Sequence, residues 1–326
     1  MGKFEVTTRI VVTGRIPSAG LDVLRNAGFS PITWNHDQPM TRSELLTAVA
    51  DAHVLVTLIT EKVDEELLIA AGSQLLAICN VAVGFNNIDI AACTARGVRV
   101  TNTPGVLTDA TADIAMALIL MVTRRLGEGE RVIRNENSWQ WGMHFMVGAG
   151  IQKRQLGIIG MGAIGAATAR RAKVFGMSVA YSSRRDVSDE IDQELGATHL
   201  SLDDLLLTSD IVSIHCPSNE STYHLIGAEQ LRKMKKSAFL INTARGPIVD
   251  EQALVEALEA GEIAGAGLDV FEFEPKVNVG LLNRQNVVLI PHLGSATAET
   301  RAAMAALAAA NAIAIANNQQ PITPVN

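Results

Sequence analysis

The glycine turn G-x-G-x-x-G at residues 160–165 constrains the fold more than any other feature of this 326-residue chain. It follows an apolar segment, 155–159, that is typical of a buried strand, and it precedes a helix predicted over 166–175. In that setting Gly160 makes the tight turn, Gly162 lets a pyrophosphate approach the backbone, and Gly165 allows close packing of helix on strand. Such a turn can also serve packing alone, but strand, spacing and helix together favour a dinucleotide site, with Ala163 and Ile164 beside the anion.

Short β-branched segments alternate with helix-length segments along the whole chain, a rhythm typical of parallel sheets covered by helices. The expected strands form two series, 9–13, 32–34, 54–57, 76–80 and 98–101, then 155–159, 178–182, 211–215, 238–242, 264–268 and 287–289. A long apolar helix is predicted over 108–135, just after Pro104 and Gly105, where the first domain crossing is expected. The alanine-rich helix over 296–317 should return to the first unit, which would make that domain discontinuous in sequence.

Composition excludes several classes of protein. With 48% hydrophobic residues the chain can bury a sizeable core, and a net charge of -7 argues against nucleic acid or an anionic membrane as the main partner. Cys79, Cys93 and Cys216 are too few for a disulfide framework and lack metal-ligand spacing, so we expect a reducing cytoplasm and no metal. The N-terminus lacks the apolar core of a signal peptide. The most apolar long run, 110–122, includes Asp113 and is shorter than the roughly 20 residues that span a bilayer.

The residues after the second strand of the later series bear on the choice of cofactor. NAD sites place an acidic residue there, about 20 residues past the glycine turn, to bind the ribose 2′-hydroxyl. This chain has Ser183, Arg184 and Arg185 instead, which can hold a 2′-phosphate through charge-assisted bonds. We therefore predict NADP(H) as the preferred cofactor. NAD(H) stays possible if the arginines are merely solvated and Asp186 serves the ribose from one turn later.

Three polar residues at or just after strand ends form a candidate catalytic set: Arg245, Glu274 and His292. Open α/β sheets bind ligands at the carboxyl ends of their strands. A guanidinium there can hold a carboxylate and polarise a carbonyl, and an imidazole supported by a carboxylate can donate a proton near neutral pH. Each of the three has an ordinary structural explanation alone, but their combination with the glycine turn favours catalysis.

The sequence resembles the D-isomer-specific 2-hydroxyacid dehydrogenase family, and within it the glyoxylate/hydroxypyruvate reductase branch. The similar segments are 58–64, 80–89, 103–113, the glycine turn, 242–250, 269–275 and 291–297. The resemblance places the family's catalytic arginine, glutamate and histidine on Arg245, Glu274 and His292. It also implies a flavodoxin-like substrate domain, 1–103 with 297–326, and an inserted Rossmann domain, 104–296. The segment at about 108–150 would form a homodimer interface.

Further roles follow from the same resemblance. The backbone N–H groups of Val83 and Gly84 should bind the substrate carboxylate, with Ile59 nearby, and Thr108 and Asp269 should contact the nicotinamide end of the cofactor. Cys216 and Pro217 should line its adenine side, although a strand end packed for its own sake is an equal alternative. Four more residues are expected to contact the cofactor: Thr222, Thr243, Ala244 and Gly294.

The branch also carries a tryptophan that reaches toward the active site of the dimer partner, and Trp141 matches it, while Trp139 would anchor the interface. The chain departs from the branch pattern after Trp141, where Gly142 and Met143 stand in place of an early proline. It departs again at 153–155, where Lys-Arg-Gln replaces Gly-Lys-Thr.

The expected reaction is reduction of glyoxylate or hydroxypyruvate to the D-2-hydroxy acid by hydride transfer from NADPH. His292 would protonate the oxygen, Glu274 would support His292, and Arg245 would hold the substrate. Two alternatives stay open. One is another D-2-hydroxyacid or phosphite dehydrogenase. The other is a dinucleotide-sensing regulator similar to the C-terminal-binding corepressors.

Overall fold

The computed structural model describes residues 8–135, 138–184 and 186–326, so Arg185 lies outside the described residues. The chain divides into two compact units, Met1–Leu107 with Ala296–Asn326, and Thr108–Ser295. The division falls four residues after the boundary expected at 103 and one residue before the boundary expected at 297. The first unit is therefore built from both ends of the chain.

The first unit is a parallel five-stranded sheet with helices on both faces. Its strand order is β2-β1-β3-β4-β5, the flavodoxin-like order. The strands are β1 (Ile10–Val12), β2 (Ile32–Thr33), β3 (Val54–Thr57), β4 (Ala77–Asn80) and β5 (Arg99–Thr101). One face packs against α1 (Ser18–Asn26) and α13 (Ala298–Ala316), and the other against α2 (Arg42–Ala48), α3 (Glu65–Ala71) and α4 (Ile90–Ala95). Because both faces are covered, strands such as β3 and β4 are apolar at nearly every position and wholly buried.

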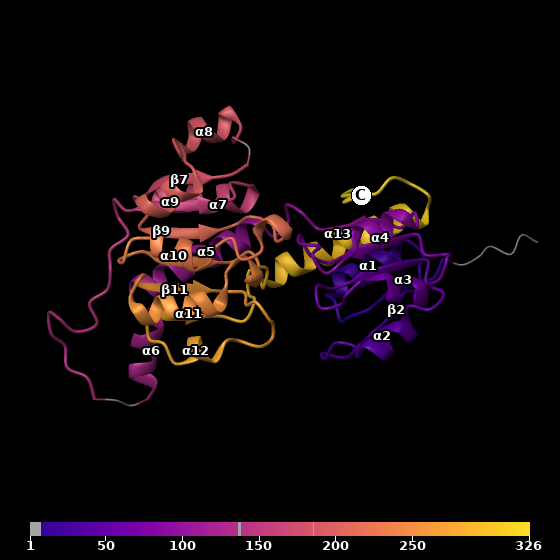
Figure 1. Cartoon of the computed structure of the whole chain (residues 1–326). Helices are drawn as coiled ribbons and strands as arrows, with labels where there is room; N and C mark the ends of the chain where they lie inside the picture. Colours follow the sequence, from indigo (N-terminus) through magenta and orange to yellow (C-terminus); the bar gives the residue numbers. More distant parts are fainter. Residues whose placement is uncertain (1–7, 136–137, 185) are drawn as a thin grey trace, which may run out of the picture. The chain divides into compact units, whose positions relative to one another are not determined.

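The last helix closes this unit. Figure 1 shows α13 in yellow beside the indigo α1, although about 280 residues separate them in sequence. A Cβ atom added at Gly20 on α1 would lie 2.8 Å from the carbonyl oxygen of Ala305 on α13. The two helix backbones approach this closely because small residues line both sides of the contact.

The second unit is a parallel seven-stranded sheet of order β12-β11-β10-β9-β6-β7-β8. Its strands are β6 (Gln155–Ile159), β7 (Ser178–Ser182), β8 (Thr198–His199), β9 (Ile211–Ile214), β10 (Phe239–Asn242), β11 (Gly265–Leu268) and β12 (Val287–Leu289). One face packs against α5 (Thr108–Thr123) and α7 (Ala163–Val174), and the other against α9 (Leu202–Thr208), α10 (Ala228–Lys233) and α11 (Glu251–Ala260). The direction of strand addition reverses between β6 and β9, and such switch points are where open α/β sheets bind ligands. The α/β fold with two parallel-sheet domains is confirmed.

The single long helix expected over 108–135 is wrong. The structure has α5, a break at Arg124 and Arg125, and then α6 (Leu126–Arg134). Arg125 has a left-handed backbone with φ of 55°. The carbonyl of Thr123 accepts the N–H of Ala149, so its bonding capacity serves a distant loop rather than a further helical turn. Apolar periodicity alone did not reveal this interruption.

Two smaller differences lie closer to the proposed cofactor site. Helix α7 begins at Ala163 rather than 166, directly after Gly162, and the short edge strand β8 was not predicted. The remaining α-helices are α8 (Asp189–Leu195) and α12 (Val279–Leu282), and two short 3-10 helices cover Glu220–Thr222 and Gly246–Ile248. Within the described ranges, no helix is both long enough and apolar enough to cross a membrane.

Candidate active site

The glycine turn joins β6 to α7 at the switch point of the second sheet. Gly160 has φ of 93°, and a Cβ atom there would lie 2.6 Å from the backbone nitrogen of Cys216, just past β9. A Cβ atom at Gly165 would lie 2.4 Å from the carbonyl oxygen of Gly160. Both positions therefore exclude any side chain, since the turn packs directly on neighbouring backbone.

Gly162 differs from the other two glycines, because a Cβ atom there would meet nothing within 4 Å. It is the N-cap of the 12-residue helix α7 and provides no side-chain cap, while Ala163 is exposed and Ile164 partly so. An uncapped helix N-terminus with open space in front presents backbone N–H groups and a partial positive charge to an anion. These residues fit the pyrophosphate of a dinucleotide.

The end of β7 lies next to this turn. The hydroxyl of Ser183 accepts the N–H of Met161 at 2.8 Å, so the strand end and the glycine turn are tied together. Arg184 is exposed, and within the described ranges its side chain makes no hydrogen bond or ion pair. Burial raises the pKa of the Cys216 thiol to about 11, against the opposing effect of the Arg184 charge. The structure thus brings Ser183, Arg184 and Cys216 together around the glycine turn.

Cys216 begins the loop expected to line the adenine side. In this loop the hydroxyl of Thr222 donates to the carbonyl of Pro217 at 2.7 Å. The same hydroxyl accepts the N–H of Asn219 at 2.9 Å. Both hydrogen bonds fix the shape of the loop, and the contacts of Pro217 and Thr222 with a cofactor stay predictions.

Arg245 follows β10 in a turn shaped by Asn242. The Asn242 side chain accepts the N–H of Ala244 at 3.0 Å and donates to the carbonyl of Arg245 at 2.9 Å. A Cβ atom at Gly246 would fall 1.9 Å from the backbone of Phe271, so this turn lies against the loop that carries Glu274. Burial lowers the pKa of Arg245 and Glu274 opposes that shift, and a guanidinium in this position stays charged.

Glu274 and His292 form a hydrogen-bonded pair, with 2.9 Å between Glu274 Oε2 and His292 Nδ1. The other carboxylate oxygen of Glu274 accepts the N–H of Phe271 at 3.0 Å. Burial would raise the pKa of Glu274, but the hydrogen bond and charge of His292, with Phe271 N–H and Arg245, hold that pKa below its ordinary value. The three residues selected from the sequence therefore lie in one charged cluster of the second unit.

The loop that carries His292 is fixed by Asp269, a fully buried residue at the end of β11. Its two carboxylate oxygens accept the N–H groups of Leu293, at 2.5 Å, and Gly294, at 2.8 Å. The carbonyl of Gly294 accepts the hydroxyl of Thr111 at 3.1 Å, which links the loop to α5, the helix that begins at Thr108. Burial raises the pKa of Asp269 despite the two N–H donors. The contact of Asp269 with the nicotinamide stays a prediction.

Thr243, next to Arg245, has a buried hydroxyl without a hydrogen-bond partner in the described part of the chain. Buried polar groups are normally satisfied, so an unpaired hydroxyl at a candidate site is compatible with a bonded ligand. It lies in the segment expected to bind the cofactor.

In the first unit, Val83 and Gly84 follow β4, and Ile59 follows the adjacent strand β3. The carbonyl of Val83 accepts the side-chain amide of Asn102 at 2.8 Å, and that of Gly84 accepts the Asn80 amide at 3.0 Å. Among residues 8–135 and the rest of the described chain, no acceptor bonds the N–H groups of Val83 and Gly84. Two fixed and available N–H donors fit the predicted binding of a carboxylate.

The segment 139–147 carries a run of exposed apolar side chains: Trp139, Trp141, Met143, Phe145 and Val147. Trp139 stacks on Phe145 with ring centroids 5.9 Å apart, whereas Trp141 is 78% exposed. The contact of Trp141 with the active site of a dimer partner stays a prediction.

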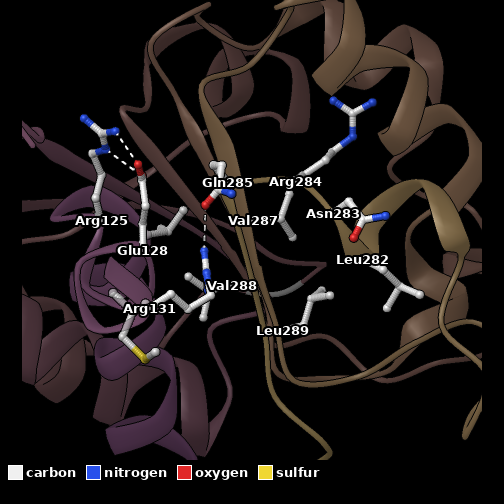
Figure 2. A pocket seen from close by; sticks show the side chains of 13 residues that line it. Arg125, Glu128, Arg131, Leu282, Asn283, Arg284, Gln285, Val287, Val288 and Leu289 are labelled. Carbon is white, nitrogen blue, oxygen red and sulfur yellow. Dashed lines mark hydrogen bonds and ion pairs between the residues drawn. The ribbon is translucent and has the colours of Figure 1, made fainter. Parts of the chain in front are cut away.

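A hollow of about 400 Å³ lies between α5, α6 and the β12 side of the second unit. Figure 2 shows two pairs among its polar side chains, Arg125 with Glu128 and Arg131 donating to Gln285. None of its 13 lining residues belongs to the predicted site. The hollow is therefore separate from the candidate active site.

One buried group beside the site was missed in the sequence. Glu251 accepts the N–H of Glu272 at 2.6 Å, and His224 Nε2 lies 2.8 Å from the Glu272 carboxylate. Burial raises the pKa of Glu251. The network joins α11 to the loop that leads to Glu274, and its members are too far apart in sequence for spacing to have revealed it.

Across the described residues, no group of three or more His, Cys, Asp or Glu side chains could hold a metal ion.

Comparisons with known proteins agree with this geometry. Residues 116–294 match the model for the NAD binding domain of D-isomer specific 2-hydroxyacid dehydrogenases. A glyoxylate reductase of Thermococcus litoralis is 46% identical over 323 residues, which cover 98% of this chain and 96% of the relative. A solved protein from Thermus thermophilus is 40% identical with a TM-score of 0.90, covering 98% of this chain and 100% of that one.

A second solved structure is the NADPH-dependent glyoxylate/hydroxypyruvate reductase of Sinorhizobium meliloti in complex with NADP and malonate. It is 34% identical, with a TM-score of 0.84 and coverage of 98% of this chain and 97% of that one. Identity at this level over nearly the whole length shows common descent, and the domain match shows a nicotinamide cofactor site. The chain belongs to the D-isomer specific 2-hydroxyacid dehydrogenase family, in its glyoxylate reductase branch.

Proposed function

We propose that this protein reduces glyoxylate or hydroxypyruvate to the corresponding D-2-hydroxy acid with NADPH. The observation that carries the proposal is the His292–Glu274 pair, 2.9 Å apart, in one charged cluster with Arg245. This set combines a proton donor, a carboxylate that supports it, and a cation for an anionic substrate.

The residue roles follow from the bonding of each group. Because Nδ1 of His292 faces Glu274, Nε2 is left to deliver a proton to the substrate oxygen. The Glu274 carboxylate favours the charged imidazolium, and Arg245 holds the substrate carboxylate and polarises the adjacent carbonyl. A bound nicotinamide supplies the hydride.

The N–H groups of Val83 and Gly84 in the first unit are further proposed donors to the substrate carboxylate, with Ile59 as an apolar neighbour. The carbonyls of Val83 and Gly84 are held by the side chains of Asn102 and Asn80, which fixes this part of the backbone. Neighbouring backbone N–H groups held in this way can bind a carboxylate. The names of the relatives favour short substrates, since several full-length relatives are called glyoxylate reductases. We place glyoxylate and hydroxypyruvate first for that reason.

The proposed preference for NADPH rests on the end of β7. An exposed arginine without a partner in the described ranges, next to a serine bonded to the glycine turn, suits a 2′-phosphate better than a free ribose hydroxyl. The Sinorhizobium meliloti relative, whose name calls it NADPH-dependent, supports the same choice.

We also propose a homodimer that works in the cytoplasm. The exposed apolar side chains of segment 139–147, Trp141 above all, favour coverage by a second copy of the chain. All three cysteines are free thiols, which suits a reducing compartment. Measurement of the molecular mass in solution tests the dimer, and the mass of a single chain would contradict this proposal.

A substrate panel tests the function. Glyoxylate, hydroxypyruvate, longer 2-oxo acids and phosphite are each assayed with both cofactors, phosphite in the oxidative direction. We expect the highest kcat/KM with glyoxylate or hydroxypyruvate and NADPH. A higher value with NADH, or with phosphite and an oxidised cofactor, would contradict the proposal.

A further inference from the structure

The loop after β7 is held by a histidine that the sequence did not single out. His199, on the edge strand β8, lies opposite Tyr181 of β7 in the parallel register, and the two rings stack with centroids 4.7 Å apart and planes 5° apart. Its Nδ1 lies 2.6 Å from a carboxylate oxygen of Asp186, and its Nε2 lies 3.1 Å from the carbonyl oxygen of Ser183. One imidazole ring therefore touches the loop on both sides of Arg184.

Both ring nitrogens of His199 face oxygen acceptors. A neutral imidazole has one N–H, and it leaves a lone pair pointing at the other oxygen. The charged imidazolium has two N–H groups and satisfies both contacts. The arrangement therefore fits a positively charged ring better than a neutral one.

The partner of His199 matters because Asp186 is the acidic residue that could serve NAD from this loop. Its carboxylate lies against His199 and carries a negative charge close to Arg184 in sequence. An unneutralised carboxylate there would repel a 2′-phosphate, which itself carries about -1.5 to -2 charges near pH 7.

We propose that His199 is a specificity-determining residue that neutralises Asp186 and fixes the Ser183 carbonyl, so that the loop accepts the 2′-phosphate of NADPH. It acts through Asp186 and Ser183 and is a positioning residue, not a catalytic one. This inference rests on the proposed NADPH preference and adds the residue that controls it.

The loop has further attachments that keep the effect local. The hydroxyl of Ser183 accepts the N–H of Met161, and the hydroxyl of Tyr181 accepts the N–H of Val187 at 3.4 Å. The first bond does not involve His199, and the second is made by the hydroxyl of Tyr181, whose ring stacks on His199. Replacing His199 should therefore change the charge of the loop without detaching it from the glycine turn.

The test measures direct binding of NADPH and NADH to the full-length protein, by nucleotide fluorescence without substrate. The variants are His199→Gln, Asp186→Asn and the double variant, with Glu190→Gln as a control that removes an exposed charge from the neighbouring helix α8. Exposed charge pairs have modest effects, so we expect His199→Gln to raise the Kd of NADPH about fivefold. The Kd of NADH should change less than about twofold, because NADH lacks the 2′-phosphate.

The double variant isolates the proposed coupling. If His199 acts by neutralising Asp186, His199→Gln should change the NADPH Kd by less than about twofold once Asp186→Asn is present. The control variant should bind both nucleotides like the unaltered protein. Equal weakening of NADPH and NADH by His199→Gln would indicate a merely structural role and overturn the inference.

The remaining outcomes separate this inference from the proposed function. If the unaltered protein binds NADPH more tightly than NADH but His199→Gln has no effect, the function stands and the role of His199 falls. If the unaltered protein binds NADH more tightly and Asp186→Asn weakens NADH selectively, Asp186 serves the ribose hydroxyl, and both the cofactor preference and the role of His199 are wrong.

Discussion

Replacing Glu274 with glutamine tests the central pair of the proposed mechanism. Glutamine keeps the size of the side chain and one oxygen acceptor, but it removes the negative charge that lies 2.9 Å from His292 Nδ1. The proposal gives this charge one task, which is to favour the imidazolium that protonates the substrate. The variant should therefore slow the chemical step and leave cofactor binding intact.

The geometry sets the size of the effect. A hydrogen bond to a charged group contributes about 1.5–3 kcal/mol, against about 0.5–1.5 kcal/mol for a neutral one. The difference, about 1–1.5 kcal/mol, corresponds to a factor of about 5–15 in rate. The His292 and Glu274 side chains are 29% and 35% exposed, so solvent screens part of the charge. We expect kcat to fall about tenfold.

The pH profile distinguishes a charge effect from a general disturbance. Because the pKa of Glu274 is held below its ordinary value of 4.5, its carboxylate stays ionised across the neutral range and gains a proton only in acid. In acid, Glu274 of the unaltered protein loses the charge that the variant lacks at every pH. The difference in kcat between the unaltered protein and Glu274→Gln should therefore shrink as pH falls through the pKa of Glu274.

The assay is kcat against pH with saturating NADPH and glyoxylate, alongside the Kd of NADPH. Glu259→Gln is the matched control, since Glu259 lies on α11 and pairs with Arg284 away from the site. An unchanged kcat at neutral pH in Glu274→Gln, or a difference in kcat that persists undiminished in acid, would refute the role assigned to this pair.

Three further predictions concern binding and stability. Gly162→Ala should weaken NADPH binding while the protein folds normally, because the added Cβ would fill open space in front of the helix. Gly165→Ala should instead lower Tm, since its Cβ would lie 2.4 Å from the carbonyl oxygen of Gly160. Equal Tm values for the two variants would contradict this. Asn102→Ala should raise the KM of glyoxylate without changing the Kd of NADPH, because it releases the Val83 carbonyl; an unchanged KM would oppose it. Burial would raise the pKa of Asp210, but the N–H of Gln155 and nearby cations hold it below 3.8. The ionised Asp210 carboxylate therefore stabilises the folded protein fully above pH 3.8, and this stabilisation is lost as pH falls through the folded-state pKa. Urea unfolding should show Asp210→Asn to be less stable than the unaltered protein by about 1 kcal/mol at pH 7, and by less in acid.

The sheet strands of both units could be predicted from sequence because they are buried on both faces. Such strands are apolar at nearly every position, so β3, β6 and β10 are visible as short runs. The edge strand β8 was missed for the opposite reason, since both its residues are exposed and it pairs on one side with only two residues of β7. The break at Arg125 was missed because it coincides with a backbone bond from Ala149 to the Thr123 carbonyl, and backbone bonds leave no pattern in side chains.

The candidate site also contains residues that could be predicted from the sequence and residues that could not. Arg245, Glu274 and His292 could be selected because each follows a strand and carries a chemically suitable group. His199 could not, since its effect on the loop depends on β8, whose pairing with β7 places its ring beside Asp186. Residues that perform chemistry are identifiable by type and position, whereas residues that hold them in place depend on pairing that the sequence alone does not reveal.

Asp269 and Glu274 show how the fold assigns different tasks to two carboxylates five residues apart. Burial raises the pKa of Asp269, while its two oxygens bind the N–H groups of Leu293 and Gly294. Burial acts on Glu274 in the same direction, but the hydrogen bond from His292 reverses the shift. Environments that push two carboxyl pKa values apart separate their roles. Asp269 therefore fixes the loop that carries His292, and Glu274 keeps the negative charge that the proposed mechanism requires. The backbone carbonyl of Asp269 also accepts the N–H of His292 at 2.8 Å, so Asp269 helps to hold His292 in the position from which its ring bonds Glu274.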